Sequence, residues 1–259
     1  MSKVKVQGHA SGTGVLTVTA PNTSTDRTIT LPDSTGTILD ENSSLPAANL
    51  TGTVATARLG TGTADSTTFL RGDQSYAEAG GGAWTFISET VASTSATISI
   101  TSGFSSTYDM YMVVITNIDP VTTDSELHML TSTDGGSSYH TSGYRYSLHC
   151  FGVGSADDSQ QYTSASELAI LKGTGSNESL QSGNRGGHCF VYIGNPSDAS
   201  EKTHIHWNGG FHTAGNEQMT VNGSGCYDAA AEDLDAVRFQ MESGNISTGN
   251  FALYGLKNS

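Results

Sequence analysis

The stretch Tyr111-Met112-Val113-Val114-Ile115 decides the fold of this chain. It is short and almost wholly apolar, and it ends in three β-branched residues. A run of this kind is typical of a strand that is covered on both faces. We therefore expect residues 108–118 to form a central strand of a β-sheet.

Similar short segments recur before and after this strand, separated by clusters of Gly, Ser, Asp and Asn. About ten short strands in about 175 residues, without a long amphipathic helical pattern, are typical of an antiparallel β-sandwich or jelly roll. Besides the central strand, we expect strands over residues 84–91, 95–100, 125–133, 144–152, 165–171, 187–194, 202–212, 217–227, 235–241 and 250–256.

The aromatic residues divide the chain into two parts. All but two of the 20 Phe, Trp and Tyr residues lie in the later part, the exceptions being Phe69 and Tyr76. Aromatic side chains supply much of the buried area of a core. We therefore expect residues 83–259 to form a head domain, whereas residues 1–80 cannot form a core from one chain alone. Glycines at 81–82 form the linker between them.

The first part nevertheless carries the pattern of short strands joined by turns. Apolar and polar residues alternate in Val15-Leu16-Thr17-Val18-Thr19 and in Arg27-Thr28-Ile29-Thr30-Leu31. An isolated small sheet is only marginally stable in water, so we expect identical copies of the chain to cover this apolar face. A disordered tail is the alternative. The residues expected at the contact between copies are Val15, Leu16, Val18, Ile29, Leu31, Ile38 and Leu39.

Several of these segments resemble a known family. Gly14–Thr23 followed by Asp26–Leu39 resembles a segment that recurs in tail fibre proteins of tailed bacteriophages, especially marine ones. Segments similar to the later parts of such fibres are Asn49–Thr53, Ala57–Ala64, Phe69–Asp73, Asp235–Phe239 and Ala252–Lys257.

The resemblance implies a virion protein, usually a homotrimer, that adsorbs to the host cell by multivalent binding. In that case residues 1–80 form a slender trimeric shaft that attaches to other virion proteins, and the jelly-roll-like head binds a glycan or protein receptor. The protein is then assembled in the host cytoplasm and located in the tail fibre, or at the capsid surface. Only a short N-terminal stretch precedes the first motif, whereas long tail fibres usually carry an extra N-terminal domain. A capsid head fibre or decoration protein is therefore the main alternative.

Charge and composition argue against several other classes of protein. The net charge of -14 makes nucleic acid and anionic membranes poor partners. No apolar run approaches the roughly 18 residues of a membrane span, so we expect no membrane insertion. Three widely spaced cysteines indicate free thiols rather than a disulfide framework.

Recognition is a better prediction than catalysis. The sequence contains no Gly-x-Ser-x-Gly elbow and no phosphate-binding loop, so we expect no enzyme and no cofactor. A polysaccharide-degrading fibre is a minor alternative, because any two of the 25 acidic residues could form a catalytic pair. Aromatic faces and planar amides suit sugars, which makes Asn208, Asn216 and Asn222 candidates beside the aromatic residues. The aromatic candidates for receptor binding are Tyr139, Tyr144, Tyr162, Trp207, Phe211 and Tyr227.

Two motifs have a structural interpretation beside a functional one. His204-Ile205-His206 could hold zinc or copper with His188 or Cys189 as a third ligand, but the polar face of an ordinary strand explains it better, and we predict no metal. Ser132–Tyr139 resembles the Asp-box of sialidase-like hairpins. There we expect the aspartate to cap the backbone of a turn.

Overall fold

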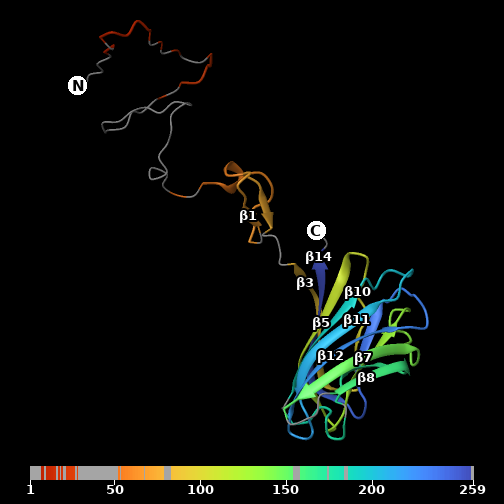
Figure 1. Cartoon of the computed structure of the whole chain (residues 1–259). Helices are drawn as coiled ribbons and strands as arrows, with labels where there is room; N and C mark the ends of the chain where they lie inside the picture. Colours follow the sequence, from red (N-terminus) through yellow and green to blue (C-terminus); the bar gives the residue numbers. More distant parts are fainter. Residues whose placement is uncertain are drawn as a thin grey trace. The chain divides into compact units, whose positions relative to one another are not determined.

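The computed structural model shows an all-β protein (Figure 1). Within the described residues there is no α-helix, and the helical content is one 3-10 turn at Thr56–Arg58. None of their helices is long and apolar enough to cross a membrane. The chain divides into two compact units, residues 1–58 and 59–259. The structure describes residues 7–8, 10–15, 17, 19, 22–26, 28, 52, 54–66, 68–78, 83–153, 158–173, 175–183 and 186–257.

Most of the expected contact between copies lies outside the described residues. Of the seven residues, Val15 is described, and its side chain is 89% exposed in the single chain. Trimerisation through this segment stays a prediction. The six others, which fall outside the described part, are Leu16, Val18, Ile29, Leu31, Ile38 and Leu39.

A small hairpin precedes the head. Strands β1 (Thr68–Leu70) and β2 (Tyr76–Glu78) pair antiparallel, and the turn between them is held by Asp73. The Asp73 carboxylate accepts hydrogen bonds from the Ser75 backbone N–H at 3.0 Å and from the Ser75 hydroxyl at 2.6 Å. Phe69 remains 62% exposed in this hairpin, so the described residues here bury little apolar surface.

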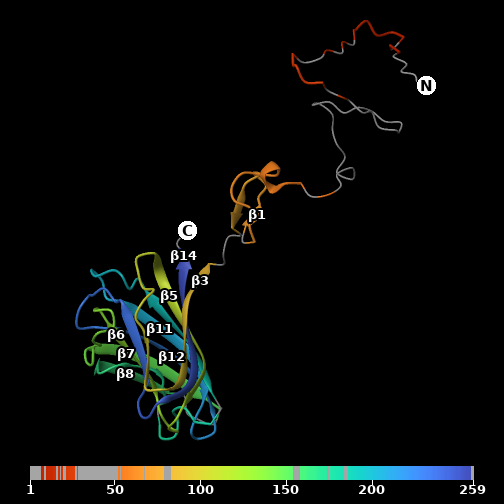
Figure 2. The ribbon, with the colours of Figure 1, turned by 180° about the vertical axis from the view of Figure 1, so that it is seen from behind.

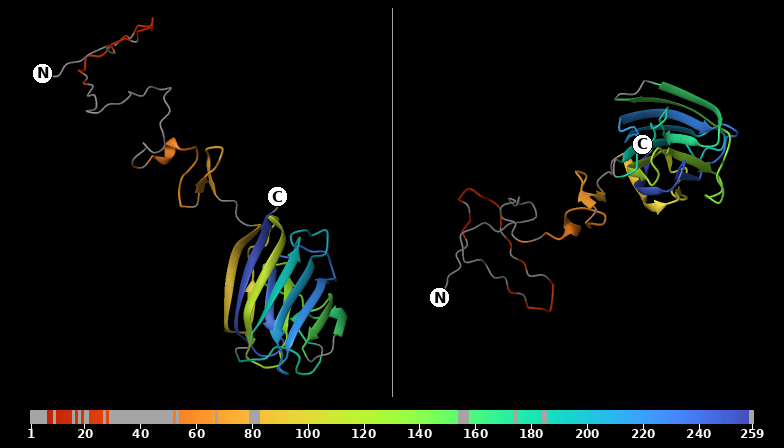
Figure 3. Two further views of the ribbon diagram at one scale, coloured as in Figure 1. Left: turned by 60° about the vertical axis from the view of Figure 1, so that its left-hand side comes forward. Right: turned by 90° about the horizontal axis from the view of Figure 1, so that it is seen from below.

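The head consists of two antiparallel sheets (Figures 1 and 2). The large sheet has eight strands in the order β3-β14-β5-β10-β11-β12-β7-β8, and the small sheet has the order β4-β13-β6-β9. Figure 3 shows the strands of the large sheet side by side. The strands are β3 (Trp84–Ser95), β4 (Thr97–Ile100), β5 (Tyr108–Pro120), β6 (Leu127–Ser132), β7 (Tyr144–Gly152), β8 (Asp158–Ala165), β9 (Leu168–Leu171), β10 (Gly187–Gly194), β11 (His204–His212), β12 (Gln218–Tyr227), β13 (Ala236–Met241) and β14 (Ile246–Lys257).

The topology is that of a jelly roll with two additions. If the hairpins β7–β8 and β11–β12 are set aside, the eight remaining strands lie in the order 1-8-3-6 in one sheet and 2-7-4-5 in the other. The two added hairpins pair with each other and extend the large sheet beyond β10. This extension widens the face of the large sheet that is turned away from the small sheet, and the candidate site lies on that face.

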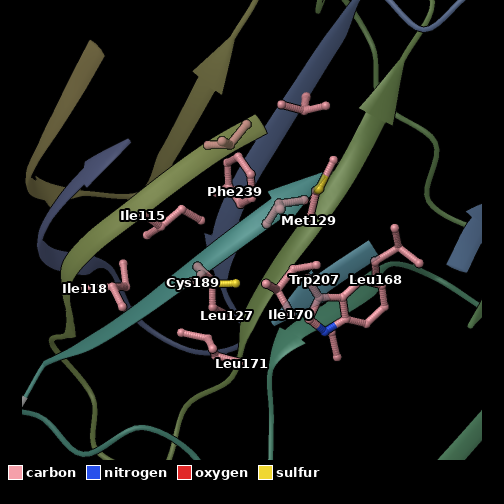
Figure 4. Packing of buried hydrophobic residues seen from close by; sticks show 14 of the residues in the cluster. Ile115, Ile118, Leu127, Met129, Leu168, Ile170, Leu171, Cys189, Trp207 and Phe239 are labelled. Carbon is pink, nitrogen blue, oxygen red and sulfur yellow. The ribbon is translucent and has the colours of Figure 1, made fainter. Parts of the chain in front are cut away.

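The core lies between the two sheets. Alternate residues of β5 point inward, and Tyr111, Val113 and Ile115 are fully buried. Side chains from the small sheet, among them Phe239 and Met129, meet them from the other side (Figure 4). Each such side chain contributes about 1.5–3 kcal/mol on burial, so the head has a core large enough to support its own fold.

The predicted central strand is confirmed. Strand β5 is an interior strand, with β14 on one side and β10 on the other. Its outward-facing residues Met112 and Val114 are half-buried, which explains why the sequence reads as almost continuously apolar. The strands predicted for the head lie within a few residues of observed ones, and β3 and β14 are longer than expected. The strands predicted over residues 15–19 and 27–31 lie mostly outside the described residues and stay predictions. Three observed strands were not predicted: β8 in the head, and the short strands β1 and β2 of the hairpin that precedes it.

The three cysteines are free thiols. Cys150 and Cys189 are buried and Cys226 is half-buried. Burial raises the pKa of the Cys189 thiol far above its usual value, so this thiol behaves as a small apolar core residue.

Candidate binding site on the outer face of the large sheet

We define the outer face as the face of the large sheet that is turned away from the small sheet. The polarity of its side chains changes from one edge to the other. A straight row of directly paired residues crosses all eight strands and is apolar or aromatic in its first half and polar in its second. In the order of the strands it consists of Phe86, Tyr254, Met112, Tyr192, His206, Ser224, Ser147 and Gln161.

The polar half of this row lines a groove. The hollow has a volume of about 440 Å³ and is formed by β7, β8, β11 and β12. A second hollow of about 400 Å³ shares Ser147, Gln161 and Ser224 with it and extends it towards Arg145 and His204. We call the two together the polar groove. Its main side chains are Ser147, His149, Gln161, His206, Asn222 and Ser224.

The strand register explains why these side chains converge. On β7 the core residues Tyr146, Leu148 and Cys150 alternate with Ser147 and His149, so these last two side chains must point outward. Asn222 is paired with His149 across the β12–β7 ladder, which places the two side chains beside each other. The groove is therefore held by the backbone of adjacent strands rather than by loops.

The groove is electrically almost neutral in a strongly acidic chain. Among the described residues that line it there is no carboxylate, and Arg145 at one end is the charged side chain. The Arg145 guanidinium lies 3.2 Å from an oxygen of Asp228, which also binds Lys202. Hydrogen bonding from Lys202 and the nearby Arg145 charge lower the pKa of the Asp228 carboxyl. Two cations share this one carboxylate, so the cluster leaves a single net positive charge at the rim of the groove.

An aromatic pair borders the groove on its apolar side. The rings of Tyr192 and His206 stack with their centroids 6.2 Å apart and an interplanar angle of 26°. Hydroxyls, amides and imidazoles can each donate and accept hydrogen bonds, and a ring face can cover the C–H groups of a ligand. The groove is therefore chemically suited to a neutral, hydroxyl-rich molecule.

The His204–His206 pair lies on this face. Both imidazoles are exposed on β11, whereas Cys189 points into the core on the other side of the sheet. No group of three His, Cys, Asp or Glu side chains among the described residues could hold a metal ion. Both histidines instead line the polar groove, His206 in its first hollow and His204 in its second.

Three of the aromatic residues predicted to bind a receptor are core residues. Tyr144 and Trp207 are fully buried, and Phe211 is 1% exposed. The Tyr144 hydroxyl accepts a hydrogen bond of 2.7 Å from the Thr131 backbone N–H. Their side chains point inward from strands whose alternate residues form the sandwich core, so they offer no ring face to a ligand. For these three the predicted contact is corrected to core packing.

The other three predicted aromatic residues are half-buried and pack against neighbours. The Arg238 guanidinium lies 3.8 Å from the ring centroid of Tyr139. Tyr162 stacks on Tyr146, with centroids 4.5 Å apart. Tyr227 stacks on a histidine, His140, at 3.8 Å. Receptor contact by Tyr139, Tyr162 and Tyr227 stays a prediction.

The Asp-box segment forms the capped turn that the sequence predicts. Asp134 accepts hydrogen bonds from the Ser138 backbone N–H at 2.8 Å, from the Ser138 hydroxyl at 2.6 Å and from the Ser132 hydroxyl at 2.8 Å. Gly135 and Gly136 both have positive φ, at 71° and 81°. These hydrogen bonds, the ones from Ser138 first, lower the pKa of Asp134 to about 2. The motif holds a turn together.

The sequence identified part of the groove. Asn222 was among the predicted amide candidates, and it lines the groove. Ser147 and Gln161 were missed, because a polar residue on a strand has no distinctive pattern and because β8 itself was not predicted. The alternation along β7 was the signal that could have identified Ser147 and His149 as outward residues.

Comparison with known proteins adds no further identification. No family model matches the chain, and no curated protein and no solved structure shows a significant match.

Proposed function

We propose that this protein is a virion fibre protein whose head binds glycans on the host cell surface and so mediates adsorption. The observation that carries the proposal is the polar groove: an open, nearly uncharged hollow with an aromatic border on a rigid sheet. Such a combination of convergent polar groups on a preformed surface favours recognition of a hydroxyl-rich ligand. The sequence resemblance to tail fibres supplies the biological setting.

Binding is a better proposal than cleavage at this groove. Hydrolysis of a glycosidic bond ordinarily needs two carboxyl groups about 5–10 Å apart. The described lining of the groove supplies none. The groups present can hold a sugar, and they offer no acid or nucleophile of the ordinary kind.

Weak single sites would act together in a trimer. Three linked heads convert the second and third binding events into intramolecular ones and raise the overall affinity by up to about 10²–10⁴. The apolar half of the outer face can add contacts between heads once the N-terminal segments hold the copies together, since Phe86 is 56% and Met110 is 37% exposed there. Trp84 lies at the same edge, where the chain from the N-terminal segment enters the head.

Binding of the full-length protein to an array of immobilised oligosaccharides tests the groove. We expect binding to a neutral oligosaccharide, and we expect the double variant Gln161→Ala, Asn222→Ala to weaken it roughly tenfold, because each lost hydrogen bond costs about 0.5–1.5 kcal/mol. The matched control is Gln240→Ala on β13 of the other sheet, which should bind like the wild type. Equal binding by all three proteins would contradict the proposed site.

A further inference from the structure

Another hollow on the outer face, apart from the polar groove, surrounds an irregularity in β5. Thr248 of β14 pairs with Asp119, but Asn250 pairs with Thr116, so β5 carries an extra residue between these points. The ladder to β10 shows the same shift, and Asn117 takes a positive φ of 53°. This is a β-bulge, which redirects side chains and is frequent beside binding sites.

The bulge opens a pocket of about 590 Å³ between β5, β10 and β14. Thr116, Asn117, His188 and Thr248 contribute to its wall, together with Asp119. The Thr248 hydroxyl donates to the Asn117 backbone carbonyl at 3.1 Å, which leaves the lone pairs of the hydroxyl oxygen available to a ligand. The strands of this pocket are β5, β10 and β14, so it is separate from the polar groove.

The Asp119 carboxylate is buried, and only one of its two oxygens accepts a hydrogen bond from a described residue. The residue is 6% exposed. One carboxylate oxygen accepts a hydrogen bond of 3.3 Å from the Gly183 backbone N–H, while the other is buried and has no hydrogen-bond partner among the described residues. A buried polar atom without a partner is costly. Because this oxygen is closed to solvent, a ligand reaches it only when the carboxylate turns towards the pocket, and the new hydrogen bond then removes the cost of the unpartnered atom.

We propose that the Asp119 pocket is a second ligand site, which binds a pair of hydroxyl groups of a neutral sugar. A carboxylate with a free acceptor position, two side-chain hydroxyls, an amide and an imidazole together match the mixed donor and acceptor character of sugar hydroxyls. The pocket volume lies within the range of sites for small organic ligands, about 300–1,000 Å³.

A metal ion fits this pocket less well. Calcium gathers six to eight oxygen ligands, usually from several carboxylates, and Asp119 is the one acid in the described lining. Divalent cation binding is therefore an outcome that the experiment must separate from sugar binding.

The pocket lies at the end of the sheet away from the chain entry. The register runs from Leu256 and Met110 beside Trp84 to Ile246 and Pro120 beside the pocket. In a head carried by its N-terminal segment, this end is free to meet a surface. The proposal does not depend on the polar groove, because the two sites use different strands.

Saturation-transfer NMR with the full-length protein tests the site, with the methyl α-pyranosides of glucose, galactose and mannose as probes. We expect transfer to at least one probe and a roughly tenfold weaker affinity for Asp119→Asn, since hydrogen bonds to charged groups are the stronger ones. Asp109→Asn, on the same strand at its other end, is the matched control and should bind like the wild type. The double variant Gln161→Ala, Asn222→Ala should retain this binding, which distinguishes the pocket from the groove.

A second variant keeps the test decisive if Asp119→Asn does not fold. Thr116→Val keeps the shape of the side chain on a half-buried strand position and removes one hydroxyl of the pocket, so it should also weaken the probe. Absence of transfer to all three probes, or unchanged affinity in both variants, would overturn the proposal. So would a calcium-induced rise in Tm that Asp119→Asn abolishes in a protein that binds none of the glycosides.

Discussion

Gly223 determines how Trp207 fits into the core. A Cβ atom at this position would lie 2.2 Å from the indole ring, well inside any normal contact distance. Trp207 is fully buried and has Tyr146 as an aromatic neighbour, with centroids 6.0 Å apart. An added Cβ at Gly223 would therefore force the buried ring to shift against its core neighbours.

Gly223→Ala should destabilise the head by about 1–3 kcal/mol, the usual cost of overpacking. Thermal unfolding followed by circular dichroism measures the effect. Gly194→Ala is the matched control, because a Cβ there meets nothing closer than 3.6 Å. Equal Tm values for the two variants would show that the Trp207 site has room to spare.

The turn at Asp134 couples stability to pH. The pKa of Asp134 is lowered to about 2 by hydrogen bonds to the ionised carboxylate. A pKa that is lower in the folded state stabilises the fold above the unfolded-state pKa of about 3.9, and this contribution is lost as the pH falls through about 2.

Asp134→Ala should therefore have a lower Tm than the wild type at pH 7, and the difference should shrink between about pH 4 and pH 2. Differential scanning calorimetry over this range measures it. A difference that stays constant down to pH 2 would mean that the ionised carboxylate does not hold the turn.

At the scale of elements, the periodicity of apolar residues predicts the strands whose side chains form the core. Strand β5 and the strands around it were predicted because their inward residues are large and apolar. Strand β8 reads DSQQYTSA, with Tyr162 as its one large side chain, and it lies at the edge of the sheet. Pairing with β7, rather than burial of its own side chains, makes it a strand, and pairing leaves no pattern in the sequence.

The candidate sites show the same limit. The aromatic residues predicted to bind sugar include Trp207. It is buried, because a β-sandwich usually buries the large aromatic side chains on the inward face of its strands. The groove instead consists of small polar residues such as Ser147 and Gln161, whose meeting depends on the order of the strands. The β5 bulge beside Asp119 depends on register, which a single sequence does not specify.

At the scale of the whole molecule, the head should fold without the segment before it. The core of the head is formed by residues from Ala92 onward. A protein that starts at residue 83 should therefore keep a β-type circular dichroism spectrum and run as a monomer by light scattering, while the full-length chain of 26.9 kDa should run as a trimer. Unfolding of the shortened protein, or a full-length monomer, would contradict this division of roles.

The most direct test of glycan recognition by the head is a crystal structure of the full-length protein with the oligosaccharide that binds best on the array. The account predicts the sugar in the polar groove, with hydrogen bonds to Gln161 and Asn222 and a ring near the Tyr192–His206 pair. A sugar bound outside the outer face, or a groove covered by a neighbouring subunit, would contradict it.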